Sequence, residues 1–207
     1  MMRILSETNG RPQTTPPTQT GPFRDRLIQA RAGLVTAVLA GQNCYVQGND
    51  APSRYRLITD TALRLTELNQ LVAYFDLSDL AYQYNLATWT QNNIRLLAIQ
   101  LNLPLPTANW WAKHGEADPG AVFVQFLGEH VLSQVNKPVI LSFDEVDQLL
   151  RAPLAANFWR LVTEIGTARA QKPEFQKLTL ILWGKASWSM LVGNGRFTSN
   201  TFKQIIL

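Results

Sequence analysis

The chain has 207 residues, of which 46% are hydrophobic and 16% are charged. This length and composition predict one globular domain with a full core, and they exclude a mainly disordered chain. The formal net charge of +4 is unevenly placed, since residues 151–207 carry +6 and residues 1–150 carry −2. A basic C-terminal quarter leaves open a surface for nucleic acid or for an acidic partner.

The sequence contains no apolar run approaching the ~18 residues that cross a bilayer, and its N-terminus lacks the apolar core of a signal peptide. Cys44 is the single cysteine, which excludes an internal disulfide and suits a reducing compartment. We therefore expect a cytoplasmic protein with no membrane segment.

Residues 1–22 (MMRILSETNGRPQTTPPTQTGP) are polar, rich in Thr and Pro, and without apolar periodicity. Such a composition cannot bury enough apolar surface to offset the entropy of ordering, so we predict a disordered tail. Residues 23–207 are expected to form the domain.

Apolar periodicity predicts helices alternating with strands along this domain. The predicted helices cover residues 23–40, 53–69, 86–102, 121–135 and 154–170, and residues 107–121 are expected to form a loop. The predicted strands cover residues 43–47, 71–76, 138–143 and 178–183, with a fifth within 201–207. This alternation predicts an α/β fold, a three-layer sandwich whose mainly parallel sheet is covered by helices on both faces.

The third predicted strand is followed directly by Asp144 and Glu145, in the stretch VILSFDE. In P-loop NTPases an apolar strand ends in such a pair, where the Asp holds Mg²⁺ and the Glu orients the attacking water. Both residues are then expected at the carboxyl edge of the sheet, where ligands of such folds bind. In the alternative interpretation, Asp144 caps the next helix and Glu145 favours its dipole.

A degenerate phosphate-binding pattern occurs in YVQGNDAPSRYRL, residues 45–57. The working pattern is GxxxxGK[ST], in which the backbone and the Lys bind phosphates and the Ser or Thr ligates Mg²⁺. Gly48 stands at the first defining position, while Ser53, Arg54 and Tyr55 replace the other three. The candidate cofactor-binding residues are therefore Gly48, Ser53, Arg54 and Tyr55.

Five residues in this stretch argue against ATP hydrolysis. Pro52 removes a backbone donor, and Ser53 replaces the glycine that lets the backbone approach phosphate closely. Arg54 presents a planar fork in place of a compact ammonium, and Tyr55 is too large for a metal-ligand position. Asp50 adds a negative charge where phosphates would lie.

From about residue 40 to its end, the sequence resembles the AAA-like domain family of P-loop NTPases found in large multidomain signalling proteins. The motifs that carry the resemblance are YFDLSDL (74–80), LNLPLP (101–106), PVILSFDEVDQLL (138–150), NFWRLVTEIGTARAQKPEFQKLTLILWG (157–184) and GRFTSNTFKQIIL (195–207). The resemblance implies a nucleotide-binding α/β domain with its P-loop at residues 48–55. It also implies that strand 138–143 lies between the other two apolar strands.

These observations lead us to expect a degenerate AAA-like NTPase domain that acts as a protein-interaction or assembly module in signalling. Asp144 is the candidate metal ligand, and Glu145 and the sensor-like Ser187 are the candidate catalytic residues, for ATP and Mg²⁺ if any nucleotide binding survives. A weak ATP-binding switch using Arg54, Asp144, Glu145 and Ser187 remains an alternative. A nucleic-acid-binding module using the basic C-terminal quarter is another.

Two further features complete these expectations. His114 and His130 stand 16 residues apart without a Cys-His cluster, so we do not expect a zinc site. The chain ends on the apolar residues Ile205, Ile206 and Leu207, which suggests a fragment of a larger architecture.

Overall fold

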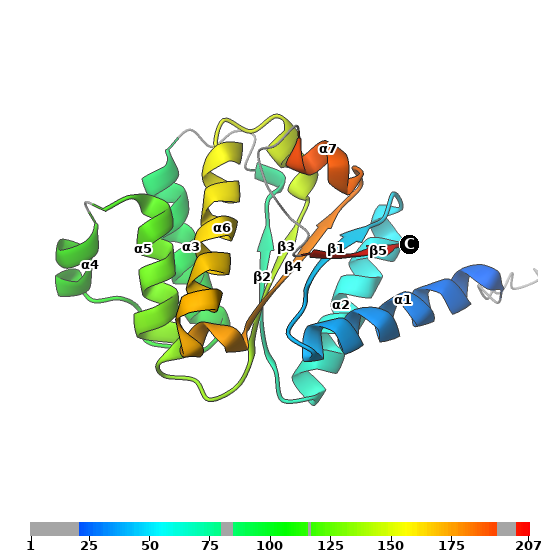
Figure 1. Ribbon diagram of the computed structural model, residues 1–207, viewed down its shortest axis with the longest axis horizontal. Coiled ribbons are helices and arrows are strands. Elements are labelled where there is room, and N and C mark those ends of the chain that lie inside the picture. Colours follow the sequence, from blue (N-terminus) through cyan, green and yellow to red (C-terminus); the bar gives the residue numbers. More distant parts are fainter. Residues whose placement is uncertain (1–20, 80–84, 116, 194–201) are drawn as a thin grey trace, which may run out of the picture.

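A computed structural model describes residues 21–79, 85–115, 117–193 and 202–207. Its centre is a five-stranded sheet with the order β2-β3-β4-β1-β5, in which every pair of neighbours is parallel (Figure 1). The strands are β1 (Asn43–Gln47), β2 (Leu71–Asp76), β3 (Val139–Asp144), β4 (Leu178–Gly184) and β5 (Phe202–Ile206). The predicted parallel α/β sheet is confirmed, and β3 lies between β2 and β4 as the family resemblance implied.

The α-helices are α1 (Pro22–Leu39), α2 (Ala51–Glu67), α3 (Leu86–Gln100), α4 (Ala108–His114), α5 (Pro119–Phe126), α6 (Ala155–Gln171) and α7 (Trp188–Val192). Short helices of other types are η2 (Leu127–Leu132), η3 (Val146–Leu150) and η4 (Pro173–Lys177). Helices α1 and α2 cover one face of the sheet, and α3, α5 and α6 cover the other (Figure 1). No described helix has the length and apolarity that crossing a membrane requires.

The central strands are apolar throughout because both faces of the sheet are covered. Every residue of β3 and β4 is buried. Successive side chains of a strand point to opposite faces, so Leu141 and Phe143 join the core under α3, α5 and α6, whereas Ile140 joins the core under α1 and α2. The continuous apolar runs in the sequence therefore reflect two cores on one sheet.

Helix α4 corrects the prediction that residues 107–121 form a loop. Thr107 starts this helix, since its hydroxyl accepts a hydrogen bond from the Trp110 N–H at 3.2 Å. Trp110 is only 8% exposed, so burial of its ring fixes the helix against the core. Asp118 caps α5 in the same way, accepting from the Gly120 N–H at 3.0 Å. Both caps are Thr or Asp residues that favour helix starts.

Other boundaries differ by small amounts. The helix predicted at 121–135 is α5 followed by the π-type turn η2. The strand predicted at 138–143 runs one residue later, to Asp144, and the predicted fifth strand is β5. The predicted disordered tail at 1–22 lies outside the described residues except at its last two positions, where α1 begins at Pro22.

Candidate functional site

The connection from β1 to α2 is short, and it lies at the carboxyl edge of the sheet. Only Gly48, Asn49 and Asp50 separate the strand from the helix, because α2 begins at Ala51. The Gly48 N–H donates to the Gly184 carbonyl oxygen at 2.9 Å. Ser53 thus lies in the first turn of a helix, where an open P-loop would still be winding around phosphates.

Asp50 occupies the N-terminus of α2 with its own carboxylate. Its Oδ2 accepts hydrogen bonds from the Ser53 backbone N–H at 3.0 Å and from the Ser53 hydroxyl. The bonds from the Ser53 hydroxyl and then its N–H lower the pKa of Asp50. The Arg54 N–H bonds to the Asp50 carbonyl oxygen at 3.0 Å. Donors that a phosphate would use at a helix N-terminus are therefore already bonded to the chain itself.

The Arg54 side chain points inward from α2 and is 2% exposed. Its Nε donates to Asp144 Oδ1 at 3.0 Å, and its Nη1 donates to the Gly48 carbonyl oxygen at 3.0 Å. Its Nη2 forms an ion pair with Glu145 Oε1. All three guanidinium nitrogens therefore bind protein oxygens, and a planar fork is suited to serving several acceptors at once.

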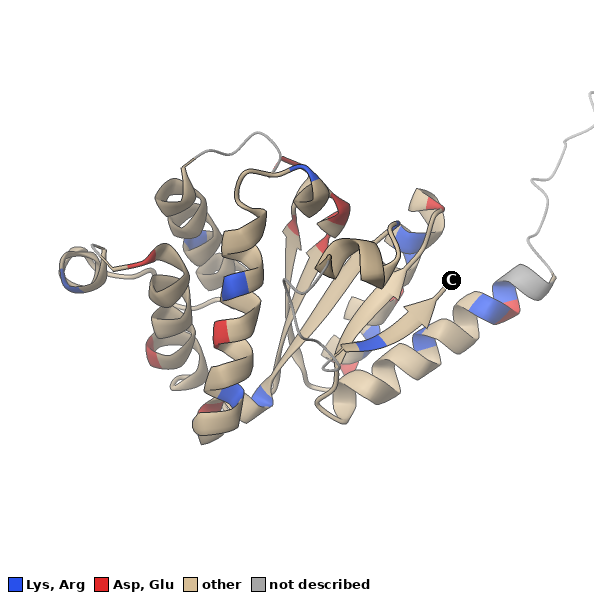
Figure 2. Cartoon of the chain, turned by 45° about the horizontal axis from the view of Figure 1, so that its top comes forward, with Lys and Arg blue, Asp and Glu red and all other residues tan. Residues whose placement is uncertain are grey.

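Asp144 and Glu145 lie beside the Gly48 turn, as the sequence led us to expect. Arg54 joins the acids to this turn, because it binds both carboxylates and the Gly48 carbonyl oxygen. Figure 2 shows acidic segments where the strands end. Asp144 Oδ2 also accepts a hydrogen bond from the Tyr74 hydroxyl at 3.2 Å. Burial, and then the nearby charge of Asp144, raises the pKa of Tyr74, so this phenol stays a donor.

The backbone at Glu145 is left-handed, with φ of 54°. This conformation is uncommon for a residue with a side chain, and it places Glu145 between the end of β3 and the start of η3. The Lys185 Nζ lies 3.6 Å from Glu145 Oε2 on the outer side of the cluster. Neither acid caps η3, because no side-chain cap hydrogen bond forms at the start of that described helix. The expected capping of the next helix by the Asp144 side chain is therefore wrong, while Glu145 does stand at the start of η3.

Sequence reasoning missed Asp147 and Tyr45, which fix the turn after β4. The Asp147 carboxylate accepts from the Lys185 N–H at 2.7 Å and from the Ala186 N–H at 2.6 Å. The Tyr45 hydroxyl donates to the Ala186 carbonyl oxygen at 2.6 Å. A third acid two residues after Glu145 was the available signal, although its partners lie almost 40 residues away in the chain.

Ser187 and Tyr55 are not part of this cluster. The Ser187 hydroxyl caps α7, accepting from the Met190 N–H at 3.4 Å, and lies 3.0 Å from the Ser189 hydroxyl. Tyr55 is 67% exposed on the outer face of α2. Among the described residues, neither one forms a hydrogen bond or an ion pair with Arg54, Asp144 or Glu145.

His114 Nε2 lies 3.4 Å from Glu129 Oε2, but no group of three or more His, Cys, Asp or Glu in the described part of the chain could hold a metal ion. His114 Nδ1 lies 2.7 Å from Gln125 Oε1, and the His130 ring stacks on Phe126 with centroids 5.4 Å apart. Both rings therefore help to pack α4 against α5 and η2.

Several cations of the basic C-terminal quarter bind groups of the protein. Arg169 donates to Asn43 Oδ1 at 2.8 Å and to the Gly41 carbonyl oxygen at 2.6 Å, and burial lowers its pKa. Arg160 pairs with Asp118 at 2.5 Å. The Lys177 ammonium donates to the Leu132 carbonyl oxygen at 2.6 Å. These contacts leave fewer free cations than the sequence charge of this segment suggests.

Solved structures with a similar fold include ORC proteins. The Aeropyrum pernix ORC1 protein in complex with DNA is 16% identical, with a TM-score of 0.55 over 91% of this chain and 46% of that one. The Aeropyrum pernix ORC2 protein, in ADPNP-ADP complexes, is 13% identical, with a TM-score of 0.59 over 94% of this chain and 50% of that one. Drosophila ORC bound to AT-rich DNA and Cdc6 gives 13% identity and a TM-score of 0.54, over 87% and 55%. This chain thus spans about half the length of the solved chains, and these likenesses show the fold alone.

A comparison with curated protein sequences gave no match. The sequence profile described as "AAA-like domain" matches residues 61–190, which is more than half of the chain and includes β2, β3, β4 and both acids. The matched region also contains the strand order that the family resemblance implied. The chain belongs to the AAA-like domain family.

Proposed function

We propose that this chain is an AAA-like domain that has given up ATP hydrolysis and acts as a protein-interaction or assembly module. The observation that carries the proposal is the Arg54 guanidinium, which is buried and bonded to Asp144, Glu145 and the Gly48 carbonyl oxygen. The expected metal ligand and the expected water-orienting acid are both engaged by a cation of the chain itself.

The residues present do not fit Mg-ATP. Binding the ion at Asp144 requires that Arg54 leave a buried ion pair, and removing one partner of such a pair costs about 3–5 kcal/mol. A nucleotide site with a Kd of 1 mM supplies only about 4 kcal/mol. Phosphates would meanwhile compete with the Asp50 carboxylate for the start of α2. The cost of moving Arg54 and the competition with Asp50 together support the proposal that this chain does not hydrolyse ATP.

Calorimetric titration with ATP and ADP, with and without Mg²⁺, tests the proposal directly. We expect no saturable binding at micromolar nucleotide and no Mg-dependent phosphate release above background. Glu145→Gln is expected to leave the background rate unchanged. Saturable, Mg-dependent binding in the micromolar range, or phosphate release that Glu145→Gln removes, contradicts the proposal.

A weak ATP-binding switch is the second candidate, favoured by the fold shared with a protein solved in ADPNP-ADP complexes. In that function Arg54 would exchange its carboxylate partners for phosphate oxygens. The matched variants are Arg54→Lys, which restores the residue type of a working loop, and Arg56→Lys, which changes an exposed arginine two positions away. Binding gained by Arg54→Lys alone supports a former nucleotide site, and binding by the unmodified chain supports the switch.

Nucleic-acid binding is a third candidate function, because two of the similar structures were solved with DNA. The internal contacts of Arg160, Arg169 and Lys177 favour a protein partner over a phosphate backbone, since phosphate binding needs free cations along one surface. Mobility-shift titration with duplex DNA at two salt concentrations separates the two. A salt-dependent shift at micromolar protein would favour nucleic acid.

A further inference from the structure

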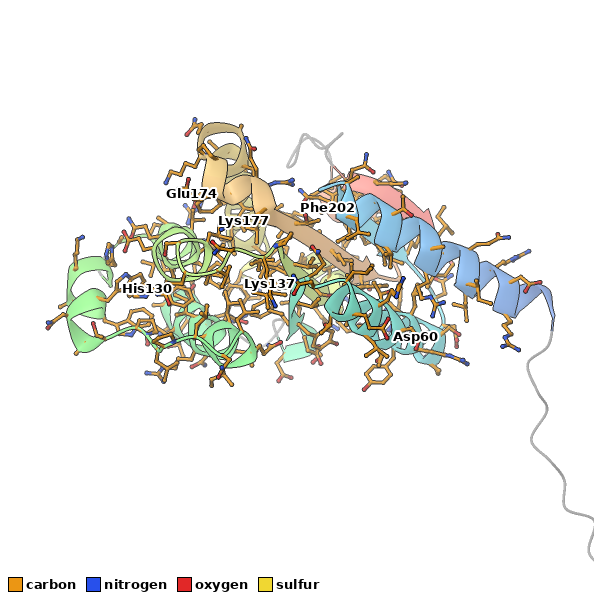
Figure 3. The ribbon with its side chains drawn as sticks, turned by 90° about the horizontal axis from the view of Figure 1, so that it is seen from below. Asp60, His130, Lys137, Glu174, Lys177 and Phe202 are labelled. Atoms are coloured by element: carbon orange, nitrogen blue, oxygen red, sulfur yellow. The ribbon has the colours of Figure 1, made fainter. Side chains whose placement is uncertain are left out.

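A groove runs between α1 and α2, on the face of the molecule away from α3, α5 and α6. Figure 3 shows the two helices side by side, with Asp60 labelled on α2. One part of the groove, of about 430 Å³, is lined by apolar Leu27, Ile28 and Leu57 and by Arg24, Arg31 and Arg56. An adjoining hollow of about 580 Å³ shares Arg31 and Asp60 with it and continues past Leu63.

The rim of the first part of this groove is positively charged. Arg24 and Arg31 are seven residues apart on α1, which places them on the same face about two turns from each other. Within the described part of the chain, neither guanidinium forms a hydrogen bond or an ion pair. Arg56 is only loosely paired, with its Nε 3.8 Å from Asp60 Oδ2.

The floor of the groove leaves apolar surface in contact with water. Ile28 is 47% exposed and Leu63 is 61% exposed, although both lie beside the α1–α2 contact. The first half of α1 extends beyond the sheet (Figure 1). Apolar surface flanked by unpaired arginines is the pattern of a docking groove whose occupant is both apolar and acidic.

We propose that this groove binds an acidic amphipathic helix of a partner protein. The proposal deepens the interaction function above, because it names the surface and the chemistry of the partner. Apolar side chains of such a helix would cover Ile28 and Leu63, and its carboxylates at one end would meet Arg24 and Arg31. The lining positions on α1 run from residue 24 to residue 36, about 18 Å of helix, so a partner helix of roughly three turns fits.

The composition of the groove disfavours two other occupants. A second copy of this chain offers no acidic helix, since no described helix carries more than two Asp or Glu residues. A nucleic-acid backbone would meet the carboxylates of Asp60 and Glu67 and an apolar floor that it cannot use. A helix that is apolar on one side and carries its carboxylates only where it faces Arg24 and Arg31 avoids Asp60 and Glu67 and covers the apolar surface.

Selection of random 16-residue peptides on the folded, full-length chain tests the proposal. We expect the selected peptides to share acidic residues on one side and Leu-like residues at helical spacing. Fluorescence anisotropy of a labelled selected peptide is expected to show binding that weakens at least about tenfold in Arg24→Glu/Arg31→Glu, and a few-fold in Ile28→Ala. Arg151→Glu, an exposed arginine outside the groove, is the matched control and should bind within about twofold of the unmodified chain.

Each other result overturns the proposal. Selected peptides that bind Arg24→Glu/Arg31→Glu as well as the unmodified chain leave the interaction function standing and place its surface elsewhere. Selection of no peptide, or of basic ones, removes the acidic-helix groove. Displacement of the labelled peptide by a DNA duplex, with duplex binding lost in the double variant, makes the groove a nucleic-acid surface. The nucleotide titrations are independent of all these outcomes, and far-UV circular dichroism verifies that each variant is folded.

Discussion

At the scale of single residues, Arg54 has the largest effect on the candidate site. A lysine at this position would offer one nitrogen, whereas the guanidinium reaches Asp144, Glu145 and the Gly48 carbonyl oxygen at once. Arg54 therefore joins the end of β3 to the Gly48 turn. It neutralises two acids that would otherwise repel each other in a largely buried position.

Arg54→Met is expected to destabilise the fold by about 3–5 kcal/mol, because it leaves two acids without their buried cation. The loss is measured as a lower midpoint in chemical denaturation. Arg56→Met is the control and should change stability by about 0–1 kcal/mol, since its ion pair with Asp60 is exposed. Adding Asp144→Asn and Glu145→Gln to Arg54→Met should recover part of the loss. Equal effects of Arg54→Met and Arg56→Met would contradict the importance of the buried ion pair.

Asp50 gives the start of α2 a dependence on pH. Its lowered pKa means that the folded chain binds the proton more weakly than the unfolded chain does. The charged cap therefore adds stability above about pH 4, the ordinary pKa of Asp, and loses it as the pH falls through the folded-state value. Asp50→Asn keeps a cap acceptor that does not titrate. We expect the unmodified chain to be the more stable at pH 7, with thermal midpoints that converge below pH 4. A constant difference at every pH would show that the charge of Asp50 plays no part.

At the scale of elements, the end of β4 at Gly184 packs closely against β1 and η3. A Cβ on Gly184 would lie 2.9 Å from the Tyr45 hydroxyl oxygen, 2.9 Å from Val146 Cγ2 and 3.0 Å from Asp147 Oδ2. These atoms belong to side chains that are bonded or buried, so they have little room to move. Tyr45 of β1, the start of η3 and the end of β4 therefore meet at a position where a Cβ does not fit unless its neighbours shift.

Gly184→Ala is expected to lower stability by about 1–3 kcal/mol through this overpacking. Gly166→Ala is the matched control, because a Cβ there meets nothing within 4 Å and the residue lies on the exposed side of α6. That change should raise stability by up to about 1 kcal/mol through helix propensity. Chemical denaturation of the two variants should give shifts of opposite sign, and shifts of the same sign would contradict the packing described for Gly184.

The strands and the location of both acids could be predicted, because apolar runs and strand-end acids are local patterns, whereas the place of β3 between β2 and β4 came only from the family resemblance. The inward direction of the Arg54 side chain could not be predicted, because Asp144 and Glu145 lie about 90 residues away in the chain. The P-loop spacing alone predicted Arg54 to be a phosphate ligand. The early start of α2 did have a signal, because Asp50 followed by Pro52 and Ser53 is a helix-start pattern. The P-loop spacing from Gly48 favoured a later start of the helix, but in the structure Asp50 caps α2 and the helix begins at Ala51.

At the scale of the whole molecule, one sheet separates two cores, and the outer strands differ from the central ones. β3 and β4 are buried along their full length, whereas β5 lies at the edge of the sheet formed by the described strands and has exposed residues at Lys203, Gln204 and Ile206. Backbone opening requires least disruption where few buried contacts must be broken. Stability should therefore fall from the centre of the sheet toward β5.

Hydrogen exchange followed by mass spectrometry is expected to show this gradient. Peptides covering β3 and β4 should exchange slowest, near the rate set by global unfolding, and peptides covering β5 should exchange earlier. The N-terminal half of α1, which extends beyond the sheet, should exchange early as well (Figure 1). Protection of β5 equal to that of β4 would mean that the sheet opens as one unit.

On the proposed function, the three-residue turn between β1 and α2 makes the loss of nucleotide chemistry hard to reverse by evolution. A return to a working loop requires freeing the start of α2 from Asp50, replacing Pro52 and Ser53, and exchanging Arg54, and these changes do not act independently. Exchanging Arg54 first exposes the acids to one another before any phosphate is bound, so an early intermediate is less stable and gains nothing. Selection on stability alone therefore holds the present sequence in place. Under this proposal, a lineage carrying this turn is expected to diversify its outer surfaces while the Gly48 turn stays closed by Arg54 and Asp50.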